Sequence, residues 1–194
     1  FRPDWERFKA DLRFGLESYG GAVAGFLLHR QDQFLVAYFR EPAEVGHYAV
    51  AYSLIMMMGI LPNAIQAAFL PKVTARYYQD GEKESMTPFV CRVMMLLSLA
   101  IGLVAAALVW PVIRVFYGAE FLPAVPPFLL LLPAVIFLAG LSTLHSAMQA
   151  RSAQRWISIG AGVALVVNLG LDLWMIPRWG IEGAAVASSS AYLV

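Results

Sequence analysis

The sequence is poor in charged residues. Only 14% of its 194 residues are Asp, Glu, Lys or Arg, while 60% are hydrophobic and the mean hydropathy is +0.66. Soluble domains carry about 25% charged residues. The net charge of +1 gives no basis for a nucleic-acid-binding surface. Cys91 is the single cysteine, which excludes a disulfide or a cysteine zinc site within this sequence. The composition predicts a membrane protein.

Motifs of soluble enzymes are also missing. The sequence contains no Gly-rich phosphate loop, no Gly-x-Ser-x-Gly, no His-Glu-x-x-His and no metal-ligand spacing. We therefore predict no enzyme activity, no cofactor and no metal site. No signal peptide is predicted, because the charged N-terminus is not followed by a short apolar core with a cleavage site. The sequence begins at Phe1 and stops at Val194 within an apolar run, so we expect a fragment of a longer protein.

Six hydrophobic segments are predicted. They cover approximately residues 12–39, 45–68, 89–115, 124–150, 156–176 and 180–194, the last being truncated. About 20 helical residues cross about 30 Å of hydrocarbon, so each complete segment is long enough to span a membrane. Residues 1–11 mix aromatic and charged side chains and are interpreted as a cytoplasmic or interfacial lead-in. The predicted fold class is an all-α integral membrane protein.

Basic residues gather in alternate loops. Three lie on the side of the short loops: Arg40, Arg114 and Arg178. Ten lie on the other side: Arg2, Arg7, Lys9, Arg13, Lys72, Arg76, Lys83, Arg92, Arg151 and Arg155. The positive-inside rule then predicts a cytoplasmic N-terminus. The alternation also requires that the first segment cross the membrane once.

Five consecutive polar residues, HRQDQ at 29–33, interrupt the first segment. On one continuous helix, His29 and Asp32 continue a stripe of small residues that we expect to border a polar cavity. Arg30 lies about 15 Å of helix rise from Arg40, too far for easy snorkelling to the outer surface. Ionisable residues inside a membrane are costly and are therefore functional-site candidates. The alternatives are an Arg–carboxylate pair between helices and an interfacial patch. The substrate-binding candidates are His29, Arg30, Asp32 and Gln33.

Asp172 is a second candidate for a carboxylate within the membrane. Asn168 lies four residues earlier, so the two side chains share a helix face. Asp172 is close to the outer end of the fifth segment, where we expect water to reach it. The hypothesis is an ion-coupling site of Asp32, Asp172 and Asn168 for a proton or another cation. The alternative is an interhelical hydrogen-bonded pair.

Four stretches resemble the bacterial polysaccharide transporters. They are REPAEVGHYAVAYSL at 40–54, LPNAIQAAFLPKVTA at 61–75, IRVFYGAEFLPAVPPFLLLLPA at 113–134 and VNLGLDLWMIPRWGIEGAAVASSSAYL at 167–193. The last is the most specific, because it matches an Asn-rich helix followed by Ile-Pro-x-x-Gly-x-x-Gly-Ala-Ala. Together they cover nearly the whole chain in order. The sequence thus resembles the polysaccharide (O-antigen-type) flippases of the multidrug/oligosaccharidyl-lipid/polysaccharide superfamily.

The resemblance implies a fold and a function. Such proteins have two six-helix lobes around a central cavity, and residues 12–194 resemble the second lobe, whose first helix lines that cavity. The family moves undecaprenyl-pyrophosphate-linked oligosaccharides to the outer leaflet of the bacterial inner membrane by alternating access. The implied partners are this lipid-linked oligosaccharide, membrane lipids, and the glycosyltransferases and polymerase of the same pathway. From chemistry alone, we expect Arg30 to bind the pyrophosphate or an acidic sugar, with hydrogen bonds from His29 and Asp32.

Three alternatives remain open. A multidrug antiporter of the same superfamily would need an acidic cavity, whereas Arg30 would repel cationic drugs. A membrane polysaccharide polymerase or ligase would need large outer loops, and the outer loops here are short. A membrane scaffold without transport activity would tolerate the loss of Arg30 and Asp32. Lipid II is a poorer substrate, because the flippases of that lipid carry an Asp-Arg pair where this sequence has the uncharged YAVAYSL.

Overall fold

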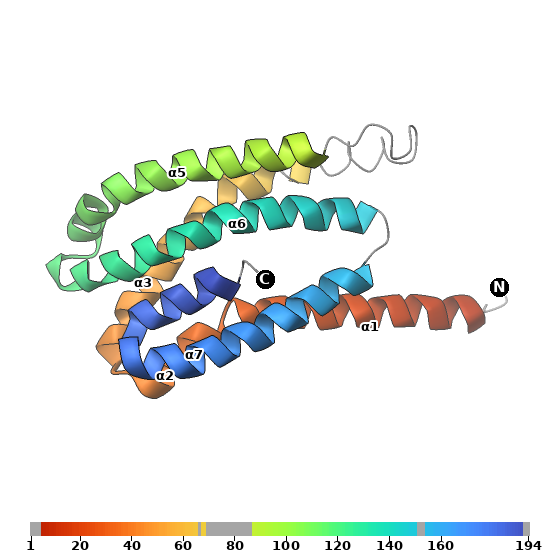
Figure 1. Cartoon of the computed structure of the whole chain (residues 1–194), viewed down its shortest axis with the longest axis horizontal. Helices are drawn as coiled ribbons and strands as arrows, with labels where there is room; N and C mark the ends of the chain where they lie inside the picture. The colour runs from red at the N-terminus through yellow and green to blue at the C-terminus, as the bar shows by residue number, and fades with distance from the viewer. Residues whose placement is uncertain (1–4, 66, 69–86, 151–153, 192–194) are drawn as a thin grey trace.

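The chain folds into a bundle of helices (Figure 1). A computed structural model describes residues 5–65, 67–68, 87–150 and 154–191. The described elements are α1 (Trp5–Leu28), α2 (Gln31–Phe39), α3 (Pro42–Met58), α5 (Thr87–Phe116), the short 3-10 helix η2 (Ala119–Ala124), α6 (Val125–Ala150) and α7 (Gln154–Ala191). No strand occurs among these residues.

Four helical stretches in the described part of the chain are long and apolar enough to cross a membrane. They are Pro42–Ile65, Thr87–Phe116, Ala119–Gln149 and Arg155–Ala191. Large apolar side chains such as Phe26, Leu103 and Val166 are exposed on several helices, as a surface facing lipid requires. The prediction of an all-α membrane protein is confirmed.

The first segment is not the single helix that we expected over residues 12–39. It divides into α1 and α2 at His29 and Arg30, which form a turn. The carbonyl of Gly25 accepts hydrogen bonds from both the backbone N–H of His29, at 3.1 Å, and the ring Nδ1 of His29, at 2.9 Å. Polar side chains that bond to a nearby backbone compete with helix continuation. The predicted stripe of small residues therefore ends at this break.

The fifth and sixth segments form the two arms of α7. The chain reverses at Gly180, where φ is +61° and ψ is −139°, and Figure 1 shows the second arm running back. This backbone conformation is accessible essentially to glycine alone. A Cβ at this position would also lie 2.9 Å from Nη2 of Arg40, whose Nε donates to Oε2 of Glu44 at 2.8 Å. This turn therefore lies where the sequence predicts the connection between the fifth segment, 156–176, and the sixth segment, 180–194.

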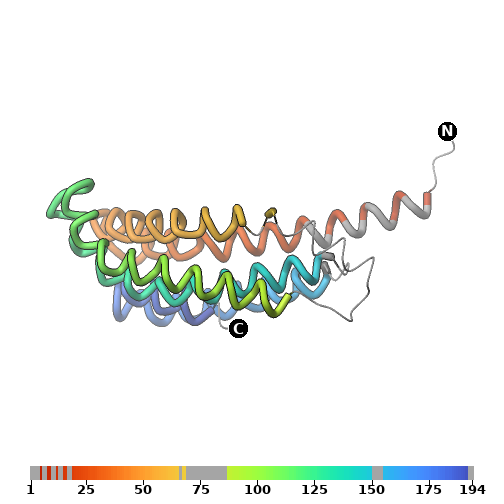
Figure 2. The backbone as a smooth tube through the Cα atoms, turned by 90° about the horizontal axis from the view of Figure 1, so that it is seen from above, coloured from red at the N-terminus to blue at the C-terminus, as the bar shows by residue number. Residues whose placement is uncertain are grey.

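The elements pack around a common apolar core. α1 and α2 lie along α7, and α6 lies between α5 and α7. Figure 2 shows α1 projecting beyond the bundle at its N-terminal end. The core includes Val36 of α2, Tyr48 of α3, Ile113 of α5, Phe128 of α6 and Ile176 of α7. Because all five elements contribute, residues far apart in sequence are held at fixed positions.

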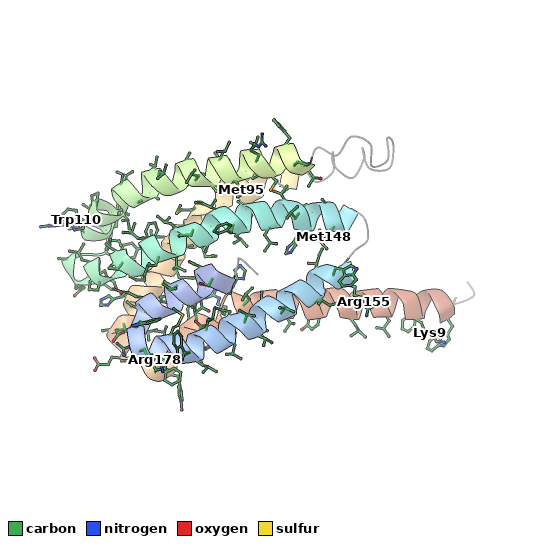
Figure 3. The ribbon with its side chains drawn as sticks, viewed as in Figure 1. Lys9, Met95, Trp110, Met148, Arg155 and Arg178 are labelled. Carbon is green, nitrogen blue, oxygen red and sulfur yellow. The ribbon has the colours of Figure 1, made fainter. Side chains whose placement is uncertain are left out.

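The two ends of the bundle carry different anchors. Figure 3 labels Trp110 and Arg178 at the end where α7 turns, and Met148, Arg155 and Lys9 toward the opposite end. At the first end, the guanidinium of Arg178 lies 4.7 Å from the ring centre of Trp174. Tryptophan and arginine together are typical of the boundary between lipid and water. We call this first end the Gly180 end.

Candidate functional site

Two consecutive side chains at the start of α2 contact two side chains one turn apart on α7. Nε2 of Gln31 donates a hydrogen bond to Oδ1 of Asn168. The carboxyl groups of Asp32 and Asp172 are close enough to interact electrostatically. Asn168 and Asp172 are fully buried, and Asp32 is 2% exposed. The expected shared face of Asn168 and Asp172 therefore points at α2.

Two hydroxyl groups from other elements complete this cluster. The phenol of Tyr48 on α3 donates to Oδ2 of Asp32 at 3.0 Å. The hydroxyl of Ser188, on the C-terminal arm of α7, donates to the same oxygen. We call Asp32, Asp172, Asn168, Tyr48 and Ser188 the buried carboxylate site. Four separate chain segments thus meet at one carboxyl group.

The buried carboxylate site has polar atoms without partners among the described residues. Within that part of the chain, Oδ1 of Asp32, both carboxyl oxygens of Asp172 and Nδ2 of Asn168 form no hydrogen bond. Two ionised carboxylates offer only acceptors and repel each other, and burial away from water adds a large cost. A proton or cation between the two carboxyl groups removes both problems. The arrangement is therefore suited to holding one of these.

The donor atoms of the site restrict the kind of cation. Carboxyl, amide and hydroxyl oxygens are the ligands that hard cations prefer, whereas zinc and copper favour nitrogen and sulfur. Over the described ranges, no group of three or more His, Cys, Asp and Glu side chains is placed to hold a metal ion. The site chemistry therefore fits a proton or an alkali cation better than a transition metal.

The depth of the site corrects one expectation. Asp172 and Ser188 each lie eight residues from Gly180, one before it and one after it. At 1.5 Å per residue this places both about 12 Å inside the Gly180 end. We expected water to reach Asp172 there, but its exposed fraction is 0% because α2 and both arms of α7 enclose it. Burial makes an uncompensated charge on Asp172 far more costly.

Arg30 belongs to a different surface. It lies with Gln33 in a groove of about 420 Å³ that α3 closes with Tyr52, Ser53 and Met56, which we call the Arg30 groove. The Arg30 side chain is exposed, and its Nη1 donates to Oε1 of Gln33 at 3.2 Å. In the described part of the chain Arg30 forms no ion pair with a carboxylate. The described part of the structure therefore does not contain the alternative that we considered, an interhelical ion pair between Arg30 and a carboxylate.

The four predicted substrate-binding residues are divided between these places. Arg30 and Gln33 line the Arg30 groove, whereas Asp32 lies in the buried carboxylate site. His29 lines a separate cavity described below. The break between α1 and α2 produces this separation, since a continuous helix would have kept His29 and Asp32 on one face. The predicted ion-coupling residues, by contrast, are brought together.

Sequence reasoning missed three residues that complete these surfaces. Tyr48 and Ser188 bond to Asp32, and Tyr52 borders the Arg30 groove. The two tyrosines lie one helical turn apart on α3, with ring centres 6.4 Å apart. A pair of tyrosines at that spacing in an apolar helix is a usable indication of a polar neighbour. The Ser188 contact has no comparable indication in the sequence.

Comparison with known proteins gives two matches. Residues 1–126 match the model of a family described as polysaccharide biosynthesis protein. Over its full length, the chain is 19% identical to the probable low-salt glycan biosynthesis flippase Agl15 of Haloferax volcanii. The chain spans 41% of the length of that relative. No solved structure matches the chain.

Proposed function

The chain belongs to the polysaccharide biosynthesis proteins, and from that premise we propose that it forms one lobe of a flippase for lipid-linked oligosaccharides. The substrate class is an undecaprenyl-pyrophosphate-linked oligosaccharide, moved from the cytoplasmic to the outer leaflet of a bacterial inner membrane. A second lobe completes a central cavity, and the two lobes alternate access to it. The similarity to a probable glycan biosynthesis flippase supports a transporter in preference to an enzyme.

The observation that carries this proposal is the exposed guanidinium of Arg30 at membrane depth. The Arg30 groove is closed by Tyr52, Ser53 and Met56, which lie within the candidate span Pro42–Ile65. An exposed cation at this depth is costly in lipid and favourable beside an anionic group. A guanidinium binds two phosphate oxygens at once, which matches a pyrophosphate or an acidic sugar.

In this proposal, the buried carboxylate site binds the ion whose movement drives transport. Its two carboxyl groups bind a proton or an alkali cation, and the Ser188 hydroxyl beside Asp32 adds a further oxygen ligand. Binding there draws together α2, α3 and both arms of α7, since each contributes a ligand or a hydrogen bond. Because α2 also carries Arg30 and Gln33, ion binding and the shape of the Arg30 groove are mechanically linked.

The test uses the full-length protein in its host. Deletion of the gene is expected to cause accumulation of single-unit lipid-linked oligosaccharide that externally added glycosidase cannot reach. Wild-type protein restores export, whereas the Arg30→Gln variant does not, although it inserts into the membrane at normal levels. Normal export by Arg30→Gln would contradict the role of the groove.

The same assay separates the flippase from the polymerase or ligase alternative. A polymerase deletion leaves single units on the outer leaflet, where the glycosidase removes them. A multidrug antiporter would leave the glycan unchanged and would instead alter the tolerance of the cells to cationic drugs. Glycosyltransferase genes beside this gene would give independent support for the flippase.

A further inference from the structure

A second cavity, of about 110 Å³, lies between α3, α5, α6 and the C-terminal arm of α7, and His29 at the break between α1 and α2 also lines it. Its wall includes Ser98 of α5, Ser142 of α6, Tyr52 of α3 and Ser188 of α7. Ser188 is also the residue whose hydroxyl donates to Asp32. Ser188 therefore borders both this cavity and the buried carboxylate site. We call it the Ser98 cavity.

Two hydroxyl groups in the wall of the Ser98 cavity are unsatisfied. The hydroxyls of Ser98 and Tyr52 are buried and form no hydrogen bond with any residue that the structure describes, and the Ser98 side chain is 1% exposed. A buried hydroxyl without a partner costs about 1–3 kcal/mol. The cavity is large enough for several water molecules, since one water needs roughly 10–15 Å³ measured in this way. Water that reached the two hydroxyls from the cavity would satisfy both.

The cavity extends away from the Gly180 end. Ser188 lies about 12 Å from the Gly180 end at 1.5 Å per residue. Helix α3 also starts at this end, because Glu44 lies beside Gly180. Asn63, also in the cavity wall, lies about 30 Å further along the helical stretch that begins with α3. The cavity thus continues from the depth of the buried carboxylates toward the opposite end of the bundle. Asp172 itself has an exposed fraction of 0%.

We propose that the Ser98 cavity is a water-filled access route through which a small cation or a proton reaches Asp32 and Asp172, with the Ser188 hydroxyl at its inner end. This inference rests on the proposed ion coupling and adds the path that the ion takes. The path lies inside one lobe, separate from the Arg30 groove. Ion and glycan therefore enter by different openings, and Tyr52 borders both.

The first experiment measures whether the cavity holds water. In full-length protein carrying Cys91→Ala and lacking other cysteines, the Ser98→Cys thiol is exposed to Ag⁺ in permeabilised membrane vesicles. Protection from later maleimide tagging of the denatured protein reports the reaction. Met94→Cys is the matched control, because Met94 lies one turn away on α5, is 2% exposed and packs in a separate apolar cluster. We expect Ser98→Cys to react at least tenfold faster. Equal rates would overturn the proposal.

The second experiment measures whether the cavity is the route. Ser98→Leu fills the cavity, and Ala107→Leu makes a comparable change on the exposed face of the same helix. We expect at least a tenfold slower cation-driven transport for Ser98→Leu only, at equal membrane abundance. Wild-type transport by Ser98→Leu overturns the route even where the Ser98→Cys thiol reacts. The route is equally overturned if Ser98→Leu fails to insert and the Ser98→Cys thiol is unreactive.

The two experiments also separate this inference from the proposed function. Transport that depends on the cation, together with an unreactive Ser98→Cys thiol, overturns the access route and leaves the proposed function intact. If the wild-type protein transports its substrate without any cation or proton gradient, both the proposed ion coupling and this inference are overturned.

Discussion

Replacing Asp172 with asparagine tests the ion-coupling hypothesis most directly. The side chain keeps its size, but one of the two facing carboxyl groups loses its charge. The attraction between a monovalent cation and a carboxylate about 4 Å away is worth roughly 4 kcal/mol at an effective dielectric constant of about 20. At about 1.4 kcal/mol per factor of ten, the cation affinity is expected to fall about a thousandfold.

The change in affinity has a consequence for thermal stability. At a concentration of about 100 times Kd, a bound cation stabilises the wild-type protein by about 2.7 kcal/mol. The same concentration is only about a tenth of Kd for Asp172→Asn, which gives a stabilisation below about 0.1 kcal/mol. Without cation, the variant is expected to be the more stable protein, because it no longer buries two facing carboxylates that lack partners.

Thermal unfolding of purified full-length protein measures both effects. Melting temperatures are compared in NaCl, KCl, LiCl and choline chloride, and in choline chloride at falling pH to detect a proton in place of a cation. Glu182→Gln is the matched control, since Glu182 is an exposed carboxylate on the same helix. The hypothesis is refuted if wild type and Asp172→Asn respond equally to every cation and to pH. A lower melting temperature for Asp172→Asn in choline would instead support a structural role of the Asp172 carboxyl group in hydrogen bonding between helices.

Three other changes have defined outcomes. Arg30→Lys keeps the charge without the planar fork and should retain part of the export that Arg30→Gln loses. The unfolding free energies of both variants should stay within about 0.5 kcal/mol of wild type. Equal export by the two variants would show that a positive charge at residue 30 makes no difference to export. Gly180→Ala should destabilise the protein by roughly 1–3 kcal/mol in thermal unfolding, whereas Gly170→Ala, in open space on α7, should not destabilise it; equal losses would contradict the special backbone of the turn. Ser188→Ala should weaken cation binding about tenfold in titrations of the melting temperature, and an unchanged midpoint would place Ser188 outside the site.

The sequence alone predicts the helices well, because membrane spans and their connections depend on local hydropathy and on glycine and proline. α5 and α6 begin and end within two residues of the predicted segments. The break at His29 and Arg30 does not follow from the sequence, because a polar run within an apolar segment is compatible with a continuous helix. The hydrogen bond from the His29 ring to the backbone carbonyl of Gly25 distinguishes the broken helix from a continuous one, and it is visible only in the three-dimensional structure.

The two candidate sites differ in the same respect. The shared face of Asn168 and Asp172 follows from their spacing of one helical turn and is predictable. Their contact with Gln31 and Asp32 depends on the packing of α2 against α7 and has no local pattern. The predicted substrate cluster fails as a unit for the same reason, since the direction of the Asp32 side chain depends on the break in the helix and on its contacts with α3 and α7.

The long sequence separation within the buried carboxylate site has a consequence for synthesis. Gln31 and Asn168 are 137 residues apart, and Asp32 and Ser188 are 156 residues apart. At about 5–20 residues per second, the ribosome supplies Asp172 and Ser188 roughly 7–30 seconds after Asp32. An aspartate within a membrane-inserted helix adds up to about 2.5–3.5 kcal/mol to the cost of insertion. The segment that carries α2 is therefore expected to reach its final, stable position only after α7 has been synthesised.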